Sequence, residues 1–359
     1  MSNLSIGIVG LPNVGKSTLF NALTRNNVLA ANYPFATIEP NTGIVPIPDS
    51  RLIKLSEIFN SKKIVPATVS FTDIAGLVSG ASKGEGLGNQ FLSHIRECAA
   101  IVQVVRVFHD DNVIHVNNKI DPLLDIDIVN TELVLADLQT VEKRLHKIEK
   151  EARVDPKLKP KYEATNKAYD ILNYGTPLNK DSSLDVEQLA DLQLLTTKPI
   201  IYVFNVDEQS LIDNALQQKM INLIKPSKAI FICAKLEDEL KNLDHDEAKE
   251  LMESYGIYKP GLDQLVTAAY ETLGLQSYLT AGEKEVRAWT IRAGSTAPQA
   301  AGVIHSDFER GFIAADIINY DDLIKEGSKL AAKNAGKMRT EGKTYIMHPN
   351  DVVEFKFNV

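Results

Sequence analysis

The residues Gly10-Leu-Pro-Asn-Val-Gly15-Lys16-Ser17 decide how this chain folds. They match G-x-x-x-x-G-K-[ST], the pattern of a loop whose backbone binds phosphate groups. An apolar run, residues 4–9, comes directly before the loop, and a helical pattern, residues 17–24, follows it. A strand, a glycine-rich turn and a helix in this order open a βα unit. The sequence therefore predicts a phosphate site at the first strand-to-helix turn of an α/β domain.

Each part of this loop has an expected task. Gly10 and Gly15 permit backbone angles that turn successive N–H groups toward phosphate oxygens. The helix that follows directs the positive end of its dipole to the same anions. We expect Lys16 to bridge the β- and γ-phosphates of a nucleotide, and the Ser17 hydroxyl to ligate Mg²⁺.

Composition limits the class of protein. At about 150 residues per domain, 359 residues indicate two or three domains. The formal net charge of -8 argues against a general nucleic-acid coat protein, although a local basic patch could bind RNA. Cys98 and Cys233 are too few for a disulfide framework and fit a reducing cytosol. We find neither a signal peptide nor an apolar run of ~18 residues, so we expect a cytoplasmic protein with no membrane partner.

Further strand-like runs cover residues 67–71, 100–107, 199–204 and 229–233. Several are apolar throughout, which is typical of parallel strands covered on both faces. Their alternation with helical patterns predicts a doubly wound, mostly parallel α/β sheet.

Residues 128–195 interrupt this rhythm and predict an inserted antiparallel helical hairpin. The first helix carries apolar residues at spacings of four and three, which form a packing seam: Val134, Leu138, Val141, Leu145, Ile148 and Ala152. A second helical pattern covers residues 162–174. Basic residues outnumber acidic ones between Lys143 and Lys161, which indicates either a solvated helix face or a contact for an anionic partner such as RNA.

The last 80 or so residues predict a separate α+β domain. Trp289-Thr-Ile is strand-like, and Val353, Phe355 and Phe357 alternate with charged residues as in a half-buried strand.

Two segments are candidates for sensing the γ-phosphate. Asp73-Ile-Ala-Gly76 follows the strand at residues 67–71. An acidic residue there can hold Mg²⁺ through a water molecule, and the Gly76 N–H can contact the γ-phosphate. Thr37, in the proline-flanked residues 32–41, is the candidate that binds Mg²⁺ when its loop closes.

The base-reading positions depart from the guanine pattern. Guanine-specific switches carry Asn-Lys-x-Asp after one strand and Ser-Ala-Lys after the next. This chain has Asn205-Val-Asp-Glu208 and Cys233-Ala-Lys235. Val206 replaces the lysine, and Glu208 replaces the aspartate that accepts from guanine. Two of the positions that bind the base in guanine-specific switches are therefore changed in this chain.

These motifs together resemble the Obg-like ATPase (YchF) family of P-loop proteins. The resemblance rests on the phosphate loop, residues 32–41, Asp73-Ile-Ala-Gly-Leu-Val, the glycine-rich stretch through Gly88-Asn89, and Asn205-Val-Asp-Glu208. Three C-terminal segments resemble the family's TGS domain, a small β-grasp module: Ala288-Trp289-Thr290-Ile291, Ala297-Pro298-Gln299-Ala300-Ala301-Gly302 and His305-Ser-Asp-Phe308.

The resemblance implies an architecture and an activity. It implies a P-loop NTPase G domain of TRAFAC type over residues 1–275, with the α-helical hairpin at 128–195 inserted, and a TGS domain over residues 276–359. It also implies hydrolysis of ATP in preference to GTP, an acid anhydride hydrolase reaction, and association with ribosomes or ribosomal RNA.

The family's site maps onto matching positions of this sequence. The nucleotide contacts would be Asn13, Val14, Gly15, Lys16, Ser17 and Thr18, with Mg²⁺ on Ser17 and Thr37. The adenine contact would fall on Asn205 and Val206.

No residue is an obvious candidate for activating the attacking water. Ras-like switches place a glutamine directly after D-x-x-G, but this chain has Leu77 there. Our candidate is His115, because family members carry a histidine in the matching segment. Asn13 adds a second hypothesis: in some P-loop switches an asparagine here helps to bind K⁺, which takes the place of an arginine finger.

Three functions therefore stay open. The first is a Mg²⁺-dependent ATPase that acts as a switch. The second is a GTPase of the same fold. The third is a ribosome- or RNA-binding regulator in which hydrolysis is incidental. We expect no DNA partner, and we predict no oligomeric state.

Overall fold

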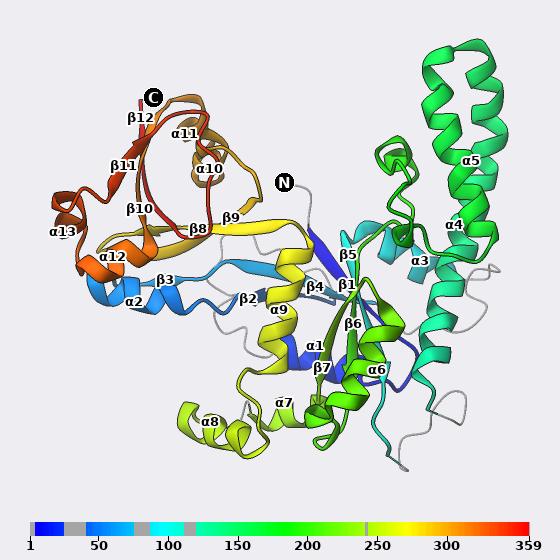
Figure 1. Cartoon of the computed structure of the whole chain (residues 1–359), viewed down its shortest axis with the longest axis horizontal. Helices are drawn as coiled ribbons and strands as arrows, with labels where there is room; N and C mark the ends of the chain where they lie inside the picture. Colours follow the sequence, from blue (N-terminus) through cyan, green and yellow to red (C-terminus); the bar gives the residue numbers. More distant parts are fainter. Residues whose placement is uncertain (1–3, 25–40, 75–86, 111–119, 241–242, 359) are drawn as a thin grey trace. The chain divides into compact units, whose positions relative to one another are not determined.

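The computed structural model describes residues 4–24, 41–74, 87–110, 120–240 and 243–358. The chain forms two compact units (Figure 1). The first consists of Met1–Val45 and Ser70–Ala268, and the second of Pro46–Val69 and Ala269–Val359. No helix in the described ranges is long and apolar enough to span a membrane.

The first unit is built on a six-stranded sheet in the order β2-β4-β1-β5-β6-β7. Its strands are β1 (Ser5–Val9), β2 (Thr42–Pro46), β4 (Thr68–Asp73), β5 (Ala100–Arg106), β6 (Ile200–Asn205) and β7 (Lys228–Ile232). Strand β1 pairs in parallel with β4 and β5, and β6 pairs in parallel with β5 and β7. Every residue of β1, β5 and β6 is buried, as expected for strands covered on both faces. The predicted doubly wound α/β architecture is confirmed.

Helices surround this sheet (Figure 1). They are α1 (Lys16–Thr24), α3 (Leu87–Glu97), α6 (Asn214–Ile224), α7 (Ala234–Leu240), α8 (His245–Ser254) and the first part of α9 (Gly261–Thr272), whose residues from Ala269 on belong to the second unit. In α9, Leu265 and Ala269 are fully buried.

The inserted hairpin consists of α4 (Pro122–Val154) and α5 (Lys159–Asn173), joined by the short turn η3 (Pro156–Leu158). Helix α4 begins earlier than the predicted residue 128, because the Asp121 side chain accepts from Leu124 N at 3.3 Å and Pro122 suits a first helical position. The predicted seam is confirmed at Val134, Val141 and Ile148, which are buried. After α5 the chain forms 3-10 turns, η4 (Leu178–Lys180) and η5 (Glu187–Leu192), which add apolar side chains to the hairpin core.

A buried carboxylate joins α4 to the segment that leads into β6. Asp137 is fully buried and accepts from Leu195 N at 2.9 Å, Thr196 N at 2.7 Å and Thr196 Oγ1 at 2.7 Å. Burial raises the pKa of Asp137, although the hydrogen bonds from Thr196 and Leu195 act in the opposite direction.

The second unit has its own six-stranded sheet, in the order β11-β10-β12-β8-β9-β3. The strands are β3 (Ile64–Val65), β8 (Leu275–Ala281), β9 (Val286–Arg292), β10 (Phe312–Asn319), β11 (Met338–Glu341) and β12 (Asp351–Phe357). Strands β8 and β9 form an antiparallel hairpin, and β12 runs parallel to β8 and antiparallel to β10. Its helices are α2 (Ser50–Phe59), α10 (Ala297–Ile304), α11 (Ser306–Arg310), α12 (Tyr320–Glu326) and α13 (Lys329–Asn334).

An early stretch of the chain belongs to this second unit. Leu52 and Leu55 of α2 are buried in a core together with Leu279 and Val286. Arg51 Nη1 donates to Pro349 O at 2.6 Å and to Asn350 Oδ1 at 2.9 Å. The single boundary at residue 275 expected from the sequence therefore needs a correction, because residues 46–69 contribute a helix and an edge strand to the C-terminal unit.

Candidate nucleotide site

The carboxyl ends of the parallel strands bring the sequence motifs to one edge of the first sheet. The phosphate loop follows β1, and Asp73 ends β4. Asn205 ends β6 and is in register with Arg106, the last residue of β5. Ligands of open α/β sheets bind at this edge, outside the carboxyl ends of the strands.

The phosphate loop has the expected left-handed backbone, but its two glycines act differently. Gly15 has a φ of 93°, and a Cβ there would collide with Asn205 Nδ2. Gly10 does not have a positive φ. It is needed because a Cβ would lie 2.8 Å from Val104 O. Asn13 has a φ of 64°, which asparagine tolerates better than most residues. Gly15 thus permits the left-handed backbone, and both glycines allow a neighbouring residue to come close to the loop, Asn205 at Gly15 and Val104 at Gly10.

Lys16 and Asp73 form an ion pair, in which Lys16 Nζ donates to Asp73 Oδ1. Both side chains are mostly buried, with 11% and 21% of their area exposed. Lys16 begins α1, where Ser17 and Thr18 occupy the first turn. The structure therefore brings the loop lysine and the predicted metal-binding carboxylate together.

The oxygen atoms at this point suit a hard cation. Mg²⁺ prefers oxygen ligands and is usually held by one or two carboxylates together with water and phosphate oxygens. Asp73 already has a cationic partner in Lys16, and Ser17 follows Lys16 directly in the chain. Within the described ranges no group of three His, Cys, Asp or Glu side chains could hold a metal. Thr37, Gly76 and His115, which were predicted for this site, lie outside the described residues.

A cavity of about 540 Å³ lies beside the phosphate loop. Gly15 and Thr18 line it from the loop side, and residues 108–110, 205–208 and 233–235 line it from the segments after β5, β6 and β7. Sites for small molecules have volumes of this order. The cavity is therefore the candidate site for the base and ribose of a nucleotide.

Asn205 connects two loops of this cavity. Its Nδ2 donates to Val14 O at 3.0 Å, and its Oδ1 accepts from Ala234 N at 3.2 Å. Val206 N donates to Ile232 O at 2.9 Å, and its side chain is buried at the cavity wall. Asn205 thus holds the phosphate loop in place, while Val206 offers apolar lining where guanine-specific proteins have a lysine.

Glu208 has a partner within the protein. Lys235 Nζ donates to Glu208 Oε1 at 3.4 Å. This hydrogen bond and the charge of Glu208 raise the pKa of Lys235. The carboxylate at the guanine-reading position is therefore engaged by a lysine from the next loop.

Sequence reasoning missed residues 108–110, which form a wall of the cavity, and Arg106, which contacts that wall from the end of β5. Arg106 closes a strand that is otherwise almost wholly apolar, and it has 1% of its area exposed. A charged residue inside an apolar strand was the available signal, because such a residue needs partners inside the protein.

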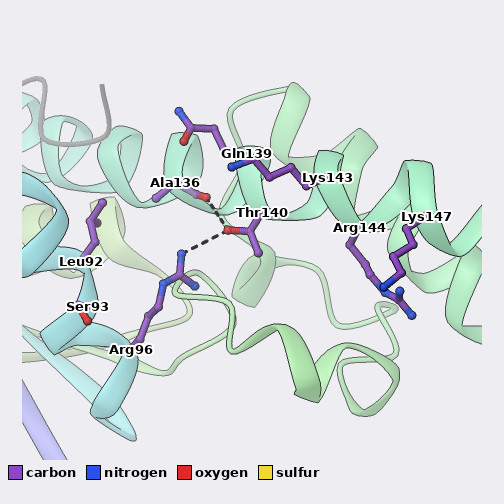
Figure 2. A pocket seen from close by; sticks show the side chains of 9 residues that line it. All are labelled: Leu92, Ser93, Arg96, Ala136, Gln139, Thr140, Lys143, Arg144 and Lys147. Atoms are coloured by element: carbon purple, nitrogen blue, oxygen red, sulfur yellow. Dashed lines mark hydrogen bonds between the residues drawn. The ribbon is translucent and has the colours of Figure 1, made fainter. Parts of the chain in front are cut away.

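A second cavity, of about 510 Å³, lies between α3 and α4 (Figure 2). Its lining contains Arg96, Lys143, Arg144 and Lys147, and none of the described residues that line it is acidic. Arg96 Nη2 donates to Thr140 Oγ1 at 3.3 Å, as Figure 2 shows. Arg144 forms an ion pair at 3.1 Å with Glu151, farther along α4. We call this the α3–α4 basic groove.

Two family models match the chain. Residues 5–206 match MMR_HSR1, described as a 50S ribosome-binding GTPase, and residues 275–358 match YchF-GTPase_C, described as a protein of unknown function (DUF933). The first model covers the phosphate loop, Asp73 and Asn205, and the second coincides with most of the C-terminal unit.

Whole-length relatives and a solved structure agree with these matches. The chain is 50% identical to the ribosome-binding ATPase YchF of Bacillus subtilis (strain 168), over 99% of this chain and 100% of the relative. It is also 50% identical to the protein of the same name in Escherichia coli O157:H7, over 98% and 99%. The solved structure of the Schizosaccharomyces pombe YchF GTPase superposes with a TM-score of 0.87 at 40% identity, covering 99% of this chain and 98% of that chain. The expected family is confirmed: this chain is a member of the YchF family of P-loop nucleotide hydrolases.

Proposed function

We propose that this chain is a cytoplasmic, Mg²⁺-dependent ATPase that prefers ATP to GTP and acts as a nucleotide-controlled switch on the ribosome. One observation carries the activity: Lys16 of the phosphate loop is paired with Asp73, and Gly15 and Thr18 beside it line a cavity of nucleotide size. The relatives that span nearly the whole chain are named ribosome-binding ATPases, in agreement with this proposal.

The chain's own groups mainly position and neutralise the triphosphate. Lys16 would move from Asp73 to the β- and γ-phosphates, and the loop N–H groups and the amino end of α1 would bind the same anions. Ser17, Thr37 and, through water, Asp73 would hold Mg²⁺, which supplies positive charge for the developing transition state. Preorganised charges of this kind are usually the largest contribution to catalysis.

Two residues complete the proposal. His115 would orient the attacking water in place of the missing glutamine, and Asn13 would help to bind K⁺. If His115→Ala hydrolyses ATP at the parental rate, His115 has no part in the mechanism. Equal rates in KCl and NaCl would remove Asn13 and K⁺ from it.

The preference for ATP rests on Val206 and on the pairing of Glu208 with Lys235. A carboxylate that reads guanine must accept from two N–H donors of the base, the ring N1–H and the amino group, and Glu208 already accepts from Lys235. We expect ATP to bind at least about tenfold more tightly than GTP. The test is a side-by-side affinity measurement of both nucleotides with Mg²⁺, with Lys16→Ala as the variant that should lose both. Equal or tighter binding of GTP would favour the second candidate, a GTPase of the same fold.

The proposal of a ribosomal partner is based on the basic surface of the hairpin. The α3–α4 basic groove carries four cationic side chains, and Lys157, Lys159 and Lys161 follow near the hairpin tip. Cationic side chains bind RNA phosphates in a salt-dependent way. We expect charge reversal at these three tip lysines to weaken cosedimentation with ribosomes.

The same change of charge at Lys219, Lys225 and Lys249, which lie outside the hairpin, is the matched control. Equal loss in both triple variants would mean that net charge alone governs binding. If an ATP analogue that cannot be hydrolysed reproduces every nucleotide-dependent effect of ATP on ribosome binding, hydrolysis is incidental and the regulator hypothesis holds.

A further inference from the structure

We propose that Arg106 is a positioning residue that holds residues 108–110 in place and thereby shapes the base side of the nucleotide site. The inference rests on the proposed function, because it assigns a task within the adenine nucleotide cavity. Arg106 would act through the wall that it supports and would not need to touch the nucleotide.

Three contacts tie Arg106 to the segment that directly follows it. Its Nε donates to Phe108 O at 3.2 Å, and its Nη2 donates to Asp110 O at 3.2 Å. The guanidinium carbon lies 4.4 Å from the centre of the Phe108 ring. One side chain thus binds two carbonyl groups and one ring of the same short turn.

These contacts require an arginine. A buried cation is costly unless its donors are satisfied, and a guanidinium offers donors in a planar fork that can also stack on an aromatic face. A lysine has a single ammonium group, so it cannot span both carbonyls and cover the ring at once. The 1% exposure of Arg106 shows that the whole group is committed to the protein interior.

The supported turn is a wall of the candidate base cavity. Phe108, His109 and Asp110 all line it. The wall is also attached to the segment after β6, because Val107 N and Phe108 N donate to Asn205 O at 2.8 Å and 3.2 Å. Releasing Arg106 would therefore remove the hydrogen bonds that it donates to Phe108 O and Asp110 O, whereas the phosphate loop would keep its own contact between Asn205 Nδ2 and Val14 O.

The test separates base binding from phosphate binding. Affinities for ATP and for inorganic tripolyphosphate, both with Mg²⁺, are measured for the parent chain and for Arg106→Lys. We expect ATP affinity to fall roughly tenfold and tripolyphosphate affinity to change less than about twofold. A general loss of structure would lower both. The matched control is Arg287→Lys, in the other unit, which removes a guanidinium stacked at 4.6 Å on Trp289 and should change neither affinity.

If Arg106→Lys does not fold, the same two affinities are measured for a second variant, Phe108→Leu. It removes the ring on which the guanidinium stacks, and it should also lower ATP affinity and spare tripolyphosphate. An equal effect on both ligands, or no effect on ATP, would overturn the inference. Failure of the proposed function looks different, because the parent chain would then bind GTP as tightly as ATP.

Discussion

Two independent features require glycine at position 15: its backbone conformation and a close contact with Asn205. Its φ of 93° lies in the left-handed region, and Asn205 Nδ2 occupies the space that a side chain would need. The same Asn205 group donates to Val14 O, so the loop and the segment after β6 approach each other at the position where no Cβ is present. The loop's shape therefore depends on a residue 190 positions away in the sequence.

Gly15→Ala should lower ATP affinity by more than about tenfold, because the added methyl group must displace Asn205 or the loop. Gly175→Ala is the matched control: its φ of 76° is also left-handed, but nothing lies within 4 Å of the added atom. Both variants should lose about 1–2 kcal/mol of stability from backbone strain. Equilibrium binding of ATP and urea denaturation of both variants check this. Normal ATP affinity in Gly15→Ala would contradict it.

At this scale the sequence predicted the residues that belong to a local motif. Lys16, Ser17 and Asp73 could be assigned because their spacing and their position at strand ends follow from phosphate chemistry. Arg106 was not assigned: its charge at the end of an apolar strand marks it in the sequence, but the backbone carbonyls that it contacts leave no pattern in residue types. The bracing role of Asn205 was hidden for the same reason.

At the scale of elements, the hairpin depends on one carboxylate. Asp137 lies on α4 and accepts two backbone N–H groups and a hydroxyl from the segment before β6. The regular apolar seam predicted the pairing of α4 with α5, because helix packing follows a period. The 3-10 turns after α5 have no such period, so their packing against the hairpin was not predictable.

Asp137→Ala should lower the free energy of unfolding by about 3 kcal/mol, since it leaves buried donors without an acceptor. Glu163→Ala on α5 is the control, because its pair with Lys159 is long, at 3.8 Å, and both side chains are exposed. It should cost less than about 0.5 kcal/mol. Urea denaturation followed by circular dichroism measures both. Similar losses in the two variants would show that Asp137 has no special role.

Asp137 should also leave a signature in the pH dependence of stability. Because burial raises its pKa in the folded protein, the folded chain keeps a proton that the unfolded chain loses near pH 4, the usual value of about 3.9. Its contribution is complete below that pH and is lost as pH rises through the folded value. The unfolding free energy of the parent minus that of Asp137→Asn should therefore decrease as pH rises from about 3.5 and then level off. A difference that grows with pH would contradict this sign.

At the scale of the whole molecule, the two units do not follow the order of the chain. Residues 46–69 leave the first sheet between β2 and β4 and complete the second unit. Strand β3 pairs with β9, although more than two hundred residues separate them in the sequence. The sequence indicated the C-terminal unit through its own strands. It could not indicate this crossing, because a two-residue edge strand carries no readable period.

Leu55→Ala should therefore destabilise the C-terminal unit by about 2–5 kcal/mol, although Leu55 lies near the amino end of the chain. ATP affinity should stay at the parental level, since Leu55 belongs to the other unit. Ile53→Ala, on the same helix but with 57% of its area exposed, is the control and should cost less than about 0.5 kcal/mol. Denaturation and ATP titration of both variants test this, and a loss of ATP affinity in Leu55→Ala would count against two separate cores.

The crossing of residues 46–69 has a consequence for synthesis. Leu55 emerges from the translating ribosome roughly 220 residues before Leu279, with which it shares a core. At a synthesis rate of about 5–20 residues per second, the apolar face of α2 is made some ten to forty-five seconds before these partner residues. During that interval most residues of this core, Leu279 and Val286 among them, have not yet been made, so we expect the apolar face of α2 to stay exposed unless another protein covers it.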